Sequence, residues 1–267
     1  MDSGRIGVDI DDFRLATREA LAHAARLDFR TIEMSMACGE LAPHNLSHSG
    51  RRHLSRHIRG LGLDFAAIVG DMPPGLRLAD PATNSEVVDR TRGLLALAAD
   101  MRVPIVTAGV LALSHHETGD PSPHAVDALR QIAVDADSTG TIYALRPSAD
   151  SAERLIRVIN EVGCPSIRIC LDPAAMVMAG NDPAAVMRQA GDQIVLSHAR
   201  DATAGSPESA GVEMPLGEGE VDLPGYMAML DASDYHGPLI IRRRNSPRPV
   251  ADIIKARKFL EDNMPRP

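Results

Sequence analysis

An alternation of short apolar runs with helical segments constrains the fold of this 267-residue chain most strongly. The helical segment at 84–100 is the clearest, because Val87, Thr91, Leu94 and Ala98 share one face. Strands that alternate with helices favour a parallel sheet, and eight such units favour a closed barrel. The predicted strands are residues 5–9, 30–36, 65–70, 103–108, 141–145, 167–171, 194–197 and 239–241.

No linker-like change of composition divides the chain, so residues 1–267 are predicted to form one α/β domain, a (β/α)8 TIM barrel. Residues 202–222 are rich in Gly and Pro and form a long connection, which is typical of lids and binding loops. Asp150 is predicted to cap the next helix, with Glu153 as its capping-box partner.

The composition excludes several classes of partner. A net charge of −8 argues against nucleic acid, whose phosphates would be repelled. No apolar run reaches the roughly 20 residues that cross a bilayer. The chain starts almost directly in a predicted strand, which predicts no signal peptide, and its three cysteines lack a CxxC spacing. We therefore expect a cytoplasmic protein with no membrane or nucleic-acid partner, and a homodimer is left open.

The lysines limit the chemistry that the chain can perform. Lys255 and Lys258 are the only ones, and both lie in the last predicted helix. Schiff-base chemistry needs a lysine in the site, so aldolase-like and pyridoxal-phosphate mechanisms are disfavoured.

Polar residues follow several predicted strands at their carboxyl ends. Arg146, Asp172, His198 and Arg242 stand at or just after the ends of four of these strands. In a parallel barrel the carboxyl ends meet at one face, and catalytic groups are found there. We expect these four side chains to face one another across the barrel mouth, with Arg200 near its rim.

Four segments carry a resemblance to a known family: 31–34, 169–172, 196–201, and 215–222 leading to 235–241. The histidine at the seventh strand, the following G-x-G-x-V-D loop and the Tyr-His-Gly turn are its most specific parts. With these the chain resembles the xylose isomerase-like TIM barrels, the sugar phosphate isomerase/epimerase superfamily. The resemblance covers nearly the whole chain and implies isomerase or epimerase chemistry on a small sugar or sugar acid.

The resemblance also implies a divalent metal held by a glutamate, an aspartate, a histidine and a second glutamate. Asp172 and His198 match the middle two ligands, but Arg146 and Arg242 stand where the glutamates belong. A guanidinium has no lone pair to offer a cation. We therefore expect a degenerate metal site, with no metal ligands and no cofactor, although Mn²⁺ or Mg²⁺ is disfavoured rather than excluded.

The residues leave two interpretations open. The two arginines either grip an anionic ligand, or one of them pairs with Asp172 and fills a lost metal site. His198 either acts as an acid/base held by Asp172 or Asp201, or is a satisfied histidine of the mouth. Glu33, at the end of the second strand, is either a base or the partner of solvent or an arginine.

The leading hypothesis is an isomerase- or epimerase-like protein that binds a small, anionic, polyhydroxylated ligand at the C-terminal barrel face. The catalytic residues are His198 and Asp172. The alternative is a non-catalytic relative that acts as a ligand sensor or interaction protein. The residues expected to bind substrate are Arg146, Arg242, Arg200 and Glu33.

Overall fold

The computed structural model describes residues 5–147, 150–206 and 209–264. Parallel strands close into a barrel in the order β1-β10-β7-β6-β5-β4-β3-β2, and β1 closes it by pairing with both β2 and β10. The prediction of a (β/α)8 barrel is confirmed, and every predicted strand overlaps an observed one. The bounds are β1 Ile6–Asp9, β2 Thr31–Ser35, β3 Asp64–Val69, β4 Ile105–Val110, β5 Ile142–Pro147, β6 Ile167–Leu171, β7 Ile194–Ala199 and β10 Leu239–Ile241.

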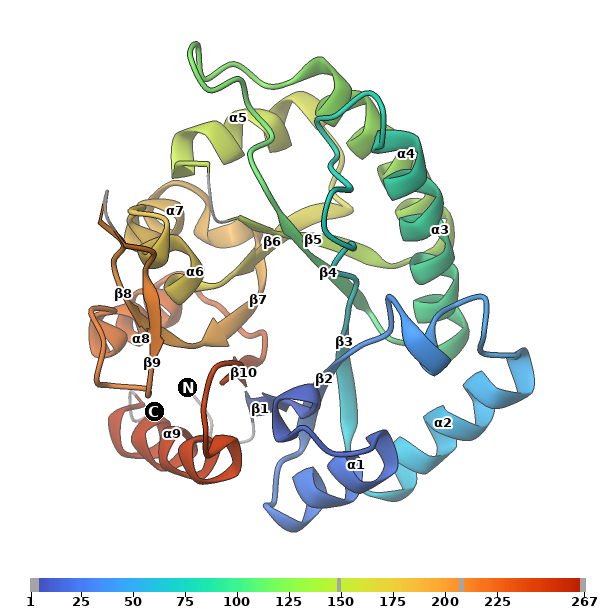
Figure 1. Ribbon diagram of the computed structural model, residues 1–267, viewed down its shortest axis with the longest axis vertical. Helices are drawn as coiled ribbons and strands as arrows, with labels where there is room; N and C mark the ends of the chain where they lie inside the picture. The colour runs from blue at the N-terminus through green and yellow to red at the C-terminus, as the bar shows by residue number, and fades with distance from the viewer. Residues whose placement is uncertain (1–4, 148–149, 207–208, 265–267) are drawn as a thin grey trace.

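Helices surround the strands, and the last helix returns to lie beside β1 (Figure 1). Short 3₁₀ turns occupy Ile10–Phe13, Gly39–Leu41 and Gly191–Gln193. The short helix α6 (Pro173–Met178), which follows β6, was not predicted. The helices are α1 Thr17–Arg26, α2 His48–Gly60, α3 Asn84–Met101, α4 Pro123–Thr139, α5 Ala152–Val162, α6 Pro173–Met178, α7 Pro183–Ala190, α8 Leu223–Ala232 and α9 Pro249–Asn263.

The apolar core has two parts. A large cluster packs the outward faces of the strands against the helices. A small cluster contains one residue from each of six neighbouring strands, which is the way the interior of such a barrel is filled. Its members are Ala67, Ile105, Ala144, Cys170, Leu196 and Ile240.

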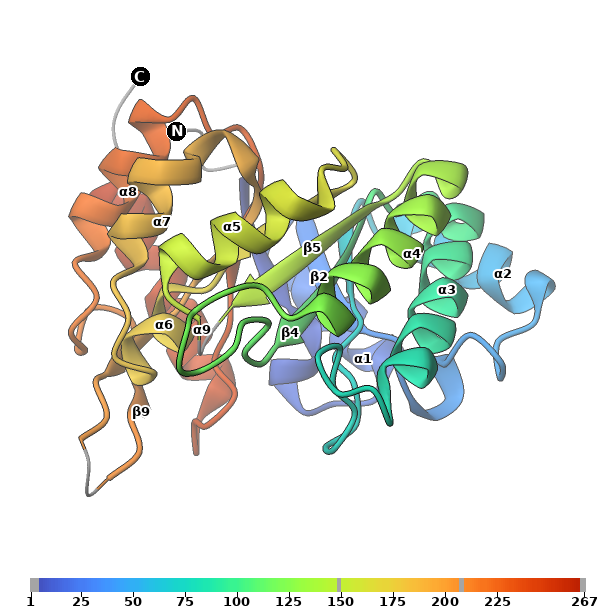
Figure 2. The same ribbon diagram turned by 90° about the horizontal axis from the view of Figure 1, so that it is seen from above.

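Two local predictions need correction. Ser151, not Asp150, caps α5 and accepts from the Arg154 N–H, because the Asp150 carboxylate is turned to the backbone N–H of Leu113 at 2.5 Å. The connection at 202–222 is not irregular throughout. It contains an antiparallel hairpin of β8 (Asp201–Thr203) and β9 (Val212–Met214), which extends away from the barrel body (Figure 2). None of the helices in the described ranges is long and apolar enough to span a membrane.

Candidate functional site

Charged side chains from seven strands converge at the C-terminal mouth of the barrel. Register irregularities precede Glu33 on β2 and Cys170 on β6, and bulges of this kind re-aim side chains beside sites. All the residues predicted for the mouth are buried there or at its edge. The strand ends and their residues are β1 with Asp9, β2 with Glu33, β3 with Asp71, β5 with Arg146, β6 with Asp172, β7 with His198 and β10 with Arg242.

His198 is enclosed at the centre of this mouth, with no exposed surface. Its Nε2 lies 3.2 Å from Glu33 Oε1, and its Nδ1 lies 3.3 Å from Asp172 Oδ2. Burial opposes protonation, but the neighbouring Cys170 sulfur and the Glu33 and Asp172 carboxylates raise the pKa of His198 well above its usual range. The two carboxylates that face the ring therefore favour its imidazolium form.

Asp172 joins β6 to the rest of the mouth through three contacts. As the N-cap of α6 it accepts the Ala175 N–H at 2.9 Å, and its other oxygen lies 3.2 Å from Arg200 Nη1. Burial opposes ionisation, but Arg200 and then His198 hold the pKa of Asp172 well below its usual range. Arg200 in turn donates to Glu213 on β9 at 2.8 Å. The hairpin is thereby tied to the site.

Arg242 is buried between two carboxylates from the first strands. Its Nη2 lies 3.0 Å from Asp9 Oδ2, and its Nε lies 3.8 Å from Glu33 Oε1. Although burial disfavours the charged form, Asp9 and Glu33 raise the pKa of Arg242 well above its usual range. Burial likewise raises the pKa of Asp9, and the opposing charge of Arg242 only partly offsets this. The guanidinium therefore stays charged.

Arg146 pairs across the mouth with Asp71, which follows β3. The Gly109 N–H also donates to this carboxylate, at 2.7 Å. A Cβ on Gly109 would lie 3.0 Å from Arg146 Nη2, so a glycine leaves the room that this pair needs. Burial would raise the pKa of Asp71, but Arg146 lowers it below its usual value. Asp71 is 31% exposed and is the solvent-exposed partner of the pair.

Arg244 extends over the mouth from the segment that follows β10. Its Nη2 lies 3.8 Å from carboxylate oxygens of both Asp9 and Asp71, and its side chain is 42% exposed. The residue before it, Arg243, pairs instead with Asp252 of α9 and with Glu213 of β9. Arg244 is the accessible cation of the site.

Several buried polar atoms of the mouth have no hydrogen-bond partner within the described part of the chain. The donors are Arg146 Nη1 and Arg242 Nε and Nη2, and the acceptors are Asp9 Oδ2 and Glu33 Oε1. The Arg242–Asp9 contact is thus an ion pair without hydrogen-bond alignment. Buried polar atoms are normally satisfied, so a cluster of exceptions calls for a ligand or ordered water. The unsatisfied donors of the two arginines therefore lie in the same mouth as the unsatisfied acceptors of Asp9 and Glu33.

The arrangement bears on the two interpretations of the sequence. The arginine on Asp172 is Arg200, whereas Arg146 and Arg242 pair with carboxylates of β3, β1 and β2. Sequence reasoning missed Asp9, Asp71 and Arg244. The rule that found the others would also have found Asp9 and Asp71, because both stand at the end of a predicted strand.

With this geometry in place, the chain can be compared with known proteins. Residues 21–263 match the profile of the xylose isomerase-like TIM barrel. The chain belongs to this family. A putative L-ribulose-5-phosphate 3-epimerase of Escherichia coli (strain K12) is 33% identical over 89 residues. That match covers 32% of this chain and 31% of the relative, so about a third of each protein is compared.

Solved structures share the fold over nearly the full length. A xylose isomerase domain protein from Planctomyces limnophilus has a TM-score of 0.82 and 20% identity, and the match covers 96% of this chain and 94% of that protein. An L-ribulose 3-epimerase has a TM-score of 0.78 and 20% identity, with 97% and 94% covered. At this level of identity the likeness concerns the fold. The solved structures therefore agree with the family profile on a xylose isomerase-like TIM barrel.

The glycine-rich motif that carried the resemblance has a structural role in this chain. The backbone N–H groups of Gly217 and Gly219 donate to Asp201 Oδ2 at 2.9 Å each, and that of Val221 donates to Oδ1 at 3.1 Å. A Cβ on Gly219 would lie 2.2 Å from this carboxylate, which explains the glycine. The motif folds residues 217–221 around the start of the hairpin.

The residues of the mouth do not fit the metal-ligand set that the resemblance implies. Two of the four positions are guanidinium groups, which cannot ligate a cation. The described ranges contain no group of three or more His, Cys, Asp and Glu side chains arranged to hold a metal. Asp9, Glu33 and Asp71, the nearby carboxylates that could have served instead, face arginines.

Proposed function

We propose that this chain is an isomerase- or epimerase-type barrel that binds a small, anionic, polyhydroxylated ligand at its C-terminal mouth without a divalent metal. The observation that carries the proposal is the cluster of buried, unsatisfied donors and acceptors on Asp9, Glu33, Arg146 and Arg242. A sugar hydroxyl both donates and accepts, so neighbouring hydroxyls match such a mixed set. An apolar ligand would leave it unsatisfied.

The anionic group of the ligand is assigned to the arginines. Arg146 Nη1 offers a free N–H inside the mouth, and Arg244 offers an accessible guanidinium at its entrance. Guanidinium groups bind carboxylate and phosphate through parallel N–H donors. The family relative named for L-ribulose 5-phosphate makes a pentulose phosphate a suitable first probe.

The proton-transfer groups are assigned to the centre of the mouth. His198, held as an imidazolium, is the acid that protonates a carbonyl oxygen of the ligand, and Asp172 keeps the ring oriented. Glu33 is ionised because His198, and then Arg242, hold its pKa below its usual value against the effect of burial. A carboxylate in that state can accept a proton from carbon. Arg200 completes the mouth by binding Asp172.

A non-catalytic ligand-binding protein is the second candidate. Both ring nitrogens of His198 face carboxylates and the ring is fully buried, which favours a structural role over proton transfer. The two candidates differ in turnover. The enzyme converts a bound sugar phosphate in metal-free buffer, whereas the ligand-binding protein returns it unchanged.

The test is calorimetric titration of the full chain in EDTA with L-ribulose 5-phosphate and, in parallel, with unphosphorylated L-ribulose. We expect the phosphate to bind at least about tenfold more tightly, because a charge-assisted bond contributes about 1.5–3 kcal/mol. Arg146→Gln and Arg244→Gln are each expected to weaken the binding of L-ribulose 5-phosphate but not that of L-ribulose. Arg52→Gln, at an exposed position, serves as the matched control. Equal affinity for both sugars, or unchanged affinity in an Arg146→Ala, Arg242→Ala double variant, contradicts the proposal.

A further inference from the structure

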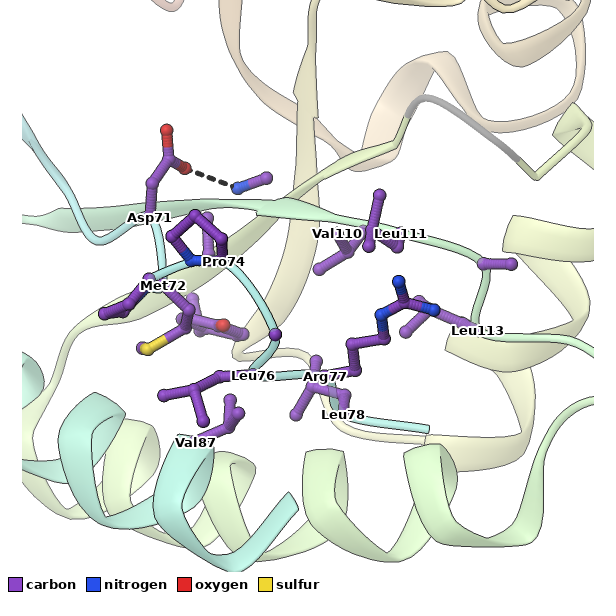
Figure 3. A pocket seen from close by; sticks show the side chains of 16 residues that line it. Asp71, Met72, Pro74, Leu76, Arg77, Leu78, Val87, Val110, Leu111 and Leu113 are labelled. Carbon is purple, nitrogen blue, oxygen red and sulfur yellow. Dashed lines mark hydrogen bonds between the residues drawn. The ribbon is translucent and has the colours of Figure 1, made fainter. Parts of the chain in front are cut away.

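A second cavity lies beside the mouth, between the ends of β3 and β4 and helix α3. Its volume is about 330 Å³, within the range of pockets that hold small ligands. Figure 3 shows Asp71 on one side of it and Arg77 extending toward the segment after β4. The remaining lining is mainly apolar, with Met72, Leu76, Leu78, Val87, Val110 and Leu113 among its members.

Three backbone N–H groups of this cavity are already bonded within the chain. The Arg77 N–H donates to Thr83 Oγ1 at 3.0 Å, and the Leu113 N–H donates to Asp150 Oδ2. The Gly109 N–H is taken by Asp71. The apolar side chains of the lining can pack against an apolar body, which needs no hydrogen bonds from them.

One wall of the cavity contains a hydrogen-bonded turn. The Leu76 N–H donates to Pro73 O at 3.2 Å and closes a turn with Pro74 and Gly75 at its centre. Gly75 has a φ of +97°, and proline followed by such a glycine is the signature of a type II turn. A preformed cavity costs little entropy to fill.

Two features of the rim point to the chemistry of the occupant. Arg77 is exposed, and no carboxylate among the described residues lies within ion-pair distance of it. Leu111 beside it is 52% exposed and adds an apolar side chain to the rim. A free cation next to an apolar cavity matches a molecule with an anionic end and an apolar body.

We propose that this cavity binds an organic acid with an apolar body, its carboxylate against Arg77 and its body among the apolar side chains of β4 and α3. The site lies beside the mouth and shares Asp71 and Gly109 with it, but its ligand is of another class, so it goes beyond the function proposed above. The ligand class is a medium-chain or aryl-substituted carboxylate rather than a bare sugar.

The experiment uses octanoate and butyrate as probes of the full chain. The sequence contains no tryptophan, so Leu111→Trp places a single indole reporter at the rim. Octanoate is expected to change its fluorescence saturably, and affinity is expected to rise about fourfold for each methylene group added from butyrate to octanoate. Calorimetry on the unmodified chain must give the same ranking.

Two variants assign the binding to the cavity. Arg77→Gln is expected to lower the affinity for octanoate about tenfold, and Arg52→Gln is its control. Ala112→Phe, at an exposed lining position, is expected to abolish binding, whereas Ala232→Phe on α8 is not. No saturable binding, affinity independent of chain length, or full affinity in Ala112→Phe overturns the proposal. Neither probe depends on the arginines of the mouth, so a failure of the sugar-phosphate proposal leaves this test intact.

Discussion

The two halves of the barrel mouth differ in charge. The first three strands end in the carboxylates Asp9, Glu33 and Asp71, whereas the other half combines Arg146 and Arg242 with Asp172 and His198. Arg146 and Arg242 form ion pairs across the two halves, and Asp172 pairs with His198 and Arg200 within its own half. The first half alone would be a cluster of like charges in a low dielectric, and only closure of the barrel brings its compensating cations.

The largest predicted effect comes from removing the cation shared by two carboxylates. Arg242→Met leaves Asp9 and Glu33 buried without it and is expected to lower the free energy of unfolding by about 3–5 kcal/mol. Urea unfolding measures this. The control is Arg92→Met, whose ion pairs on the helix surface are half exposed and contribute about 0–1 kcal/mol. Equal losses in the two variants would remove the distinction between mouth and surface.

The pH dependence of stability should show the imidazolium at the junction of the halves. The pKa of His198 is raised above its ordinary value of 6.5, so its contribution is full below pH 6.5 and is lost as pH rises through the folded pKa. The pKa values of Asp172 and Glu33 are lowered from 3.8 and 4.5, so their contributions are lost as pH falls below those values.

The measurement is the unfolding free energy of the wild type minus that of His198→Gln from pH 5 to 9. This difference should fall by about 1.4 kcal/mol per pH unit above 6.5, until the folded pKa is reached. Burial raises the pKa values of Asp11 and Asp12 to about 6 and about 7, so their contributions to stability also fall as pH rises. These contributions are present in both proteins and cancel in the difference. A difference that does not change above pH 6.5 shows that His198 is neutral.

A smaller effect is expected at Asp71, the solvent-exposed end of the mouth. Arg146→Met leaves Asp71, which is 31% exposed and keeps its bond from Gly109, so we expect a loss of about 1–2 kcal/mol. A double-mutant cycle with Asp71→Asn should give a coupling below that of Arg242 with Asp9→Asn. The reverse order would mean that exposure does not set the strength of these pairs.

The smallest effect is a steric one at the same pair. Gly109→Ala places a Cβ 3.0 Å from Arg146 Nη2 and 3.2 Å from Asp71 Oδ1, so both side chains must shift by a few tenths of an ångström. The expected cost is about 1 kcal/mol, and it should be smaller in the Arg146→Met background, where only the contact with Asp71 remains. Gly60→Ala, in open space at the end of α2, is the control that should not destabilise.

Sequence reasoning found the fold and one half of the mouth. The strand and helix periods specify the barrel because each element buries one face, and the specific His198 motif directed attention to the later strands. Glu33 was noticed, but its partners His198 and Arg242 lie far away in sequence. Long-range pairing of this kind, like the side on which Arg244 lies, depends on the closed barrel and is not written in local periodicity.

Arg146 and Arg242 stand at the mouth where the family resemblance places two metal ligands. The direct test is calorimetric titration of chelator-stripped protein with Mn²⁺, repeated with Mg²⁺, Co²⁺ and Zn²⁺. The account predicts no micromolar binding of any of these ions, because two cations already neutralise the carboxylates. Micromolar binding that is lost in His198→Ala would contradict the account and return the family's metal chemistry to this site.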